Sequence, residues 1–145
     1  MAERKVSRSI VIDAPAARIF EVLSDPSRHH EFDGSGTLRG STFGPKRLTE
    51  GAEFGMDMRM FGVPYRMVNR VVDLEKDRRV IWKTLGPQRW GYELEELPEG
   101  GTRVTETFDY SRGPSFWYVL LGFPTKNAAA MERTLLRLRE MTESR

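Results

Sequence analysis

Residues 54–74 read FGMDMRMFGVPYRMVNRVVDL, and apolar and polar side chains alternate on both sides of Gly62-Val63-Pro64. Alternation with a period of two is typical of a half-buried β-strand, and a Gly-Val-Pro break between two such runs is typical of a turn. The stretch therefore predicts two antiparallel strands, at residues 54–60 and 65–74, that are joined as a hairpin.

The same pattern extends along the chain in both directions. After the first strand, Ala14-Pro15 ends the alternation, with Asp13 placed to cap a short helix and Pro15 suited to its first turn. Asp25 can cap a second short helix that runs toward Phe32. Including that first strand, turn signals separate predicted strands at 6–13, 37–41, 79–85, 88–97 and 102–110.

The chain closes with a helical pattern. Apolar side chains recur every three or four positions from Ala128 through Leu135 and Leu138, and Thr142 continues the same face. This spacing predicts an amphipathic helix, about twenty residues and roughly 30 Å long. A curved antiparallel sheet covered by one helix is an α+β fold, and we expect residues 1–145 to form a single domain with space for a ligand between sheet and helix.

The composition excludes several classes of protein. The chain has 145 residues, no cysteine and a net charge of +2, with acidic and basic residues mixed along it. The absence of cysteine excludes disulfides and thiolate chemistry, and the mixed charges argue against nucleic-acid binding. Because we find neither a signal-peptide pattern nor an apolar run of about 18 residues, we expect a cytoplasmic protein without stable membrane insertion.

Strand alternation assigns a set of large side chains to the inner face of the sheet. Methionine suits adaptable binding surfaces, and Trp and Tyr combine a large apolar area with one polar atom. We therefore predict a partly open pocket for a small hydrophobic molecule, and core packing is the ordinary alternative for any one of these residues. The predicted lining residues are Phe54, Met56, Met58, Tyr65, Met67, Trp82, Trp90, Tyr92 and Phe108 from the strands, and Asn127 and Met131 from the final helix.

Two of the inward positions are polar, namely Asn69 and Glu106. A buried carboxylate is costly unless it is paired, or else it takes up a proton. Glu106 is therefore the candidate catalytic residue and, together with Asn69, a candidate polar anchor for a ligand. The alternatives for Glu106 are a salt bridge to an arginine that reaches inward, or a position near the sheet end where water enters.

The residues do not predict a metal or a cofactor. His29 and His30 are the only histidines, and adjacent residues on a helix point about 100° apart, so they do not chelate one ion. His30 and Asp33 could form an acid–base pair at the pocket mouth, with simple solvation as the alternative. The glycines at residues 34–40 lack the spacing of a phosphate loop, and no nucleophile elbow is present.

The segment SIVIDAPA at residues 9–16, followed by IFEVLSDP at 19–26, resembles the start of START-like (SRPBCC) proteins. GTRVTE at 101–106 resembles a later element of their bacterial polyketide cyclase/dehydrase-type branch. The resemblance implies a helix-grip fold, in which a seven-stranded antiparallel sheet curves around the C-terminal helix, two short helices follow the first strand, and the centre is hollow. Members of this superfamily bind lipids, sterols, plant hormones and polyketides, and some cyclise polyketides. No set of catalytic residues carries over to this sequence.

Three functions follow as hypotheses. The first is the binding of a small hydrophobic molecule, a lipid or polyketide-like metabolite, in the central cavity. The second is an enzyme of the cyclase or dehydratase type, in which Glu106 or a tyrosine moves protons. The third is a protein-interaction module. An apolar segment precedes the final helix and comprises Phe116, Trp117, Tyr118, Leu120, Leu121 and Phe123. This segment could serve as a lid, as a homodimer contact or as a partner site.

Overall fold

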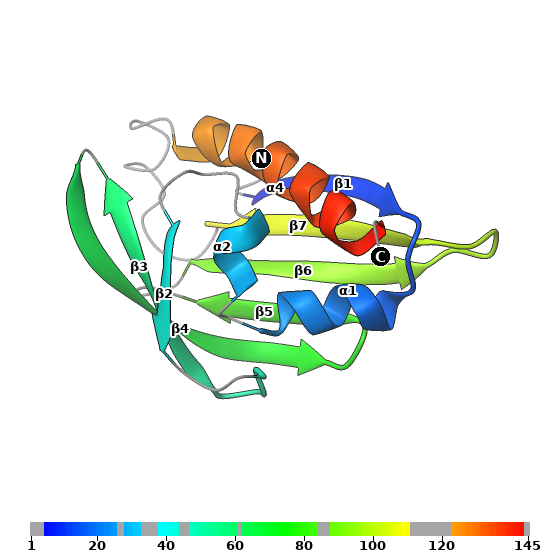
Figure 1. The fold of residues 1–145 in the computed structure, drawn as a ribbon, viewed down its shortest axis with the longest axis horizontal. Helices are drawn as coiled ribbons and strands as arrows, with labels where there is room; N and C mark the ends of the chain where they lie inside the picture. Colours follow the sequence, from blue (N-terminus) through cyan, green and yellow to red (C-terminus); the bar gives the residue numbers. More distant parts are fainter. Residues whose placement is uncertain are drawn as a thin grey trace.

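The fold is an α+β helix-grip arrangement, seen in a computed structural model (Figure 1). One curved sheet forms a layer, and the helices lie on one side of it (Figure 1). The structure describes residues 5–25, 28–32, 38–43, 47–60, 62–83, 88–110 and 123–143.

The sheet has seven antiparallel strands, as predicted, in the order β1-β7-β6-β5-β4-β3-β2. Apart from the first strand, which pairs with the last, each neighbour in the sheet is also a neighbour in sequence, so the chain meanders through hairpins. The strands are β1 (Lys5–Ile12), β2 (Leu38–Phe43), β3 (Glu53–Met60), β4 (Val63–Glu75), β5 (Arg79–Lys83), β6 (Arg89–Glu96) and β7 (Thr102–Asp109).

Two short helices, α1 (Ala16–Leu23) and α2 (His29–Phe32), follow the first strand, and the long helix α4 (Phe123–Glu143) ends the fold. The prediction that Asp13 caps α1 was wrong. Pro15 occupies the position before the first turn and no side chain caps it, because Asp13 lies two residues too early to reach the helix. The backbone N–H of Asp13 instead donates to Glu143 Oε2 at 2.7 Å, which connects the end of β1 to the end of α4.

The predicted stripe on α4 is buried against the sheet. Met131, Leu135, Leu138 and Thr142 are each at most 2 % exposed. The hydroxyl of Thr142 donates to the Leu138 carbonyl at 2.8 Å, so this buried polar group is satisfied within the helix. The helix α4 contacts β1 and β7, and α1 contacts β6. The short helix α2 contacts both α4 and β2, so it lies between the long helix and the opposite edge of the sheet (Figure 1).

The register of β4 contains an irregularity that decides which side chains face inward. Val71 pairs with Trp82, but the next pairs are Asp73 with Ile81 and Leu74 with Val80. The extra residue turns Asp73 to the outer face, where its carboxylate accepts a hydrogen bond from Arg79 Nε at 2.9 Å. That hydrogen bond, with the charge of Asp73, raises the pKa of Arg79 above its usual value.

Gly91 marks a close approach between β6 and β5. A Cβ atom built on Gly91 would lie 2.7 Å from Ile81 Cγ1 and 2.7 Å from the backbone oxygen of Val80. Gly91→Ala is therefore expected to destabilise the protein by about 2 kcal/mol, because the two strands must separate locally. Urea denaturation would measure this, with Val68→Ala at a site that is 47 % exposed as the control, expected within about 0.5 kcal/mol of the parent. An unchanged urea midpoint for Gly91→Ala would mean that the strands yield at no cost.

Candidate functional site

Glu106 lies on β7 within the inner face of the sheet and is 1 % exposed. Its Oε2 accepts two hydrogen bonds, from Trp90 Nε1 at 2.7 Å and from the Tyr92 hydroxyl at 3.1 Å. Trp90 and Tyr92 are two residues apart on β6, so both face the same side, and Tyr92 is the register partner of Glu106. These two side chains of β6 together hold the Glu106 carboxyl group in a fixed orientation.

This three-residue arrangement has a definite chemical capacity. Hydrogen bonds to a carboxylate are short and strong when the acceptor is charged, and here they satisfy the polar atoms of the partly buried Trp90 and the buried Tyr92. A fixed carboxyl group can hold, accept or deliver a proton at one place on the inner face. Sequence reasoning named all three residues but did not pair them. The signal that could have done so is the cross-strand register of residues 88–97 with 102–110.

Aromatic rings surround the buried carboxyl group on the same face. The ring centroids of Phe54 and Trp82 lie 5.5 Å apart, those of Trp82 and Tyr92 6.0 Å apart, and those of Trp90 and Phe108 5.1 Å apart. These five side chains come from four strands, β3, β5, β6 and β7. The ring contacts form two groups, one of Phe54, Trp82 and Tyr92 and the other of Trp90 and Phe108, both on the face that strand alternation predicts. Trp90 packs against both hydrophobic clusters and so connects them.

The second predicted anchor, Asn69, has a different environment. It lies on β4, pairs with Phe54 and is 2 % exposed. Its Oδ1 has no hydrogen-bond partner among the residues that the structure describes, and the same holds for the buried Oε1 of Gln88. A buried acceptor without a donor is costly, so each such group calls for an explanation. Sequence reasoning missed Gln88, because it treated that residue only as the beginning of a strand after a turn.

For several of the other predicted ligand residues, the structure describes the backbone but not the side chain. Met131 is fully buried and packs with Phe108 and Tyr110. Met56 pairs with Met67, and Met58 pairs with Tyr65 between β3 and β4, but their side chains lie outside the described part of the structure. The same is true of the side chain of Asn127 in α4, and Asp33 and the apolar residues 116–120 also lie outside the described residues.

The structure also bears on the sites that the sequence argued against. Within the described ranges, no three His, Cys, Asp or Glu residues gather where they could hold a metal ion. In the same ranges, no helix has the length and the apolar character that crossing a membrane requires.

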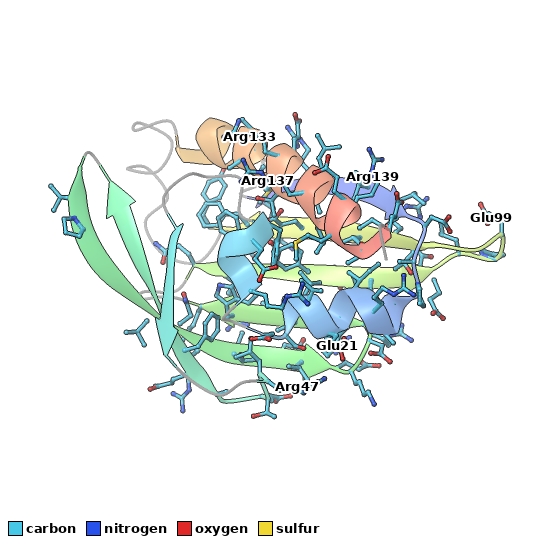
Figure 2. All side chains as sticks on the ribbon, in the orientation of Figure 1. Glu21, Arg47, Glu99, Arg133, Arg137 and Arg139 are labelled. Atoms are coloured by element: carbon cyan, nitrogen blue, oxygen red, sulfur yellow. The ribbon has the colours of Figure 1, made fainter. Side chains whose placement is uncertain are left out.

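Among the residues that the structure describes, two surface hollows are lined by residues other than the predicted ligand residues. One of about 440 Å³ lies where the β6–β7 turn meets the start of α1, beside Asp13, Arg18 and Glu96. The other, of about 290 Å³, includes Glu21 and Arg47, whose charged groups lie 3.8 Å apart (Figure 2). The central cavity therefore stays a prediction.

Comparison with known proteins identifies the family to which the chain is similar. A family model described as "Polyketide cyclase / dehydrase and lipid transport" matches residues 3–143. The uncharacterized protein Rv0088 of Mycobacterium tuberculosis is 43 % identical over 139 residues, which cover 92 % of this chain and 62 % of the relative. The chain thus spans about three fifths of the length of this curated relative.

Solved structures show the same fold at low sequence identity. The solution structure of KanY has a TM-score of 0.74 at 13 % identity, and the match covers 99 % of this chain and 100 % of KanY. The crystal structure of DynU16, a protein of the dynemicin biosynthetic locus, has a TM-score of 0.68 at 18 % identity, covering 99 % of this chain and 48 % of DynU16. At such identities these likenesses establish the fold alone.

Proposed function

This chain belongs to the polyketide cyclase / dehydrase and lipid transport family, and we propose that it binds a small hydrophobic molecule between the inner face of its sheet and α4. The aromatic layer formed by Phe54, Trp82, Tyr92, Trp90 and Phe108 supplies the apolar contact surface. Burial of apolar surface contributes about 25 cal/mol per Å² removed from water, so a molecule that covers part of this layer gains most of its affinity there.

The observation that carries the proposal is the environment of Asn69. A side chain that is 2 % exposed, on the face that carries these rings, has an acceptor oxygen with no hydrogen-bond partner among the described residues. A polypeptide that only needed a core would place an apolar side chain there, because an unmet buried acceptor is costly. A bound molecule with a donor group supplies the missing partner.

The test is to identify what the protein carries when it is isolated. We expect organic extraction of the purified protein, followed by mass spectrometry, to yield one molecule or one homologous series at near-stoichiometric amount. Trp82→Ala should lower its occupancy about tenfold, because Trp82 lies at the centre of the aromatic layer. The exposed-site control Val68→Ala should retain the molecule. Wild-type protein that is empty after isolation from several hosts would count against the proposal.

A second candidate function is a cyclase or dehydratase type of enzyme, favoured by one observation. Glu106 is a buried carboxyl group held by two donors on one oxygen, which is an arrangement suited to moving a proton. DynU16, which shares this fold, comes from a biosynthetic locus.

The enzyme candidate predicts a separation between turnover and affinity. Glu106→Gln keeps the shape and an acceptor oxygen but cannot exchange a proton, so we expect conversion of the extracted molecule to fall about a hundredfold or more. The dissociation constant for that molecule should stay within about twofold, as measured by calorimetry. An equal loss of turnover and affinity would point to binding without chemistry.

We extend the proposal to partners and location. The protein is expected to act in the cytoplasm, without a cofactor or a metal, and without nucleic acid as a partner. A homodimer through the apolar segment 116–123 stays a proposal, because residues 116–122 lie outside the described part of the structure. Sedimentation velocity over a hundredfold range of concentration would reveal such a dimer, and a single monomer species throughout would contradict it.

A further inference from the structure

Asn69 of β4 lies level with Gln88, the residue that directly precedes β6, and β4 and β6 flank β5. Arg70 of β4 pairs with Lys83 of β5, and Lys83 pairs with Arg89 of β6. Asn69 and Gln88 each precede one of these paired arginines, and β4 and β6 run in the same direction because both are antiparallel to β5. Their Cα atoms are therefore separated by two strand spacings, roughly 9.5 Å.

The side-chain amides of Asn69 and Gln88 each have an oxygen that lacks a hydrogen-bond donor among the described residues. Both of these oxygens are buried. Asn69 faces inward, and Gln88 lies two residues before Trp90, whose side chain contacts the inward-facing Glu106. Gln88 adjoins the first residue of β6, and the alternation of that strand, continued by one residue, places Gln88 on the same face as Trp90. Two acceptors therefore occupy the same face, beside the end of β5 and the start of β6.

The aromatic layer begins directly beside these two acceptors. Trp82 and Trp90 are register partners on β5 and β6, and Trp82 is also the partner of Val71, two residues beyond Asn69. A flat ring lying on Trp82 and Trp90 would have its edge at the level of the two amide oxygens. A carboxamide oxygen accepts hydrogen bonds and does not donate them, so its complement is a hydroxyl or an N–H group.

We propose that Asn69 and Gln88 form a donor-selecting subsite, which makes the protein prefer apolar ring molecules that carry hydroxyl or N–H groups at one end. This inference rests on the proposed function, since it presumes a ligand on the inner face. It disfavours molecules whose polar end only accepts hydrogen bonds, such as an ether or the carboxylate of a fatty acid, because these leave both amide oxygens unmet.

Two matched probes test the preference. Naphthalene-2,3-diol offers two hydroxyl donors at one end of the ring system, whereas 2,3-dimethoxynaphthalene keeps the ring and the oxygen atoms but has no donor. We expect wild-type protein to bind the diol about tenfold more tightly in calorimetry, which corresponds to a few-fold for each added hydrogen bond. Asn69→Leu and Gln88→Met, which keep the approximate size of each side chain, should each weaken diol binding about three- to fivefold and leave the ether unchanged.

The controls separate this inference from the proposed function. Arg70→Met, at an exposed neighbouring position, should change neither affinity. Equal affinity of wild-type protein for both probes, or variants that weaken both probes alike, would overturn the donor preference and leave hydrophobic binding standing. Wild-type protein that binds neither probe would overturn both. If Asn69→Leu does not fold, Gln88→Met and the wild-type comparison still decide the result.

Discussion

Replacing Glu106 by leucine is expected to destabilise the protein by about 3 kcal/mol. The substitution removes the acceptor of two hydrogen bonds and leaves Trp90 Nε1 and the Tyr92 hydroxyl facing an apolar side chain. A buried donor that loses its partner costs about 1–3 kcal/mol, and two donors are affected here. Removing a buried carboxylate returns part of this cost, since its own desolvation disappears, so the net effect lies in the lower half of the summed range of about 2–6 kcal/mol. Urea denaturation followed by circular dichroism measures it.

Two further variants show whether the unmet donors are the cause. Glu106→Gln retains an acceptor oxygen of the same reach, so its free energy of unfolding should lie within about 1 kcal/mol of the parent. In the triple variant Glu106→Leu, Tyr92→Phe, Trp90→Phe both donors are gone with the acceptor. Its loss of stability should be smaller than the sum of the losses in Glu106→Leu and in the double variant Tyr92→Phe, Trp90→Phe, because removing both partners of a hydrogen bond is nearly neutral. If Glu106→Leu unfolds at the wild-type urea concentration, Trp90 and Tyr92 do not depend on this carboxyl group.

Replacing Phe54 by alanine should cost about 4 kcal/mol of the free energy of unfolding. Phe54 is fully buried, and its ring packs edge-on against Trp82 with the centroids 5.5 Å apart. Truncation loses both the transfer free energy of the ring and the contacts of its neighbours, since a close-packed interior relaxes only in part. Val63→Ala, at a position that is 63 % exposed, is the control and should stay within about 0.5 kcal/mol.

The Phe54 variant also bears on the ligand. If the ring lines a binding site, the space that it leaves lies beside Trp82, and a small apolar molecule can fill it. We therefore expect toluene to raise the melting temperature of Phe54→Ala by more than that of the parent. A melting temperature of Phe54→Ala that toluene does not change would show that the surrounding side chains collapse into the space.

Much of the inner face could be predicted from the sequence, because a strand fixes which side chains share a face. Asn69, Trp82 and Glu106 each follow from alternation within a single strand, and the structure buries all three. The stripe on α4 follows in the same way from helical spacing, from Met131 to Thr142. These predictions held because they depend only on neighbours a few residues away in the chain.

What the sequence left open concerns pairing between strands. The irregularity after Val71 adds one residue to β4 that no local pattern reports, and it turns Asp73 outward toward Arg79. The hydrogen bonds from Trp90 and Tyr92 to Glu106 depend on the register of β6 with β7. The sequence pattern also did not show where α1 begins, so Asp13 was predicted as its cap although Pro15 occupies that position.

By itself, the sequence determined that one curved antiparallel sheet is covered by one long helix, and it determined which residues lie on the inner face of that sheet. Only the tertiary structure decided which of those polar residues find partners. Glu106 meets two donors on the next strand, whereas the oxygens of Asn69 and Gln88 meet none among the described residues. The physical reason is that the direction of a side chain is a local property of the backbone, while a hydrogen bond depends on the relative position of two strands.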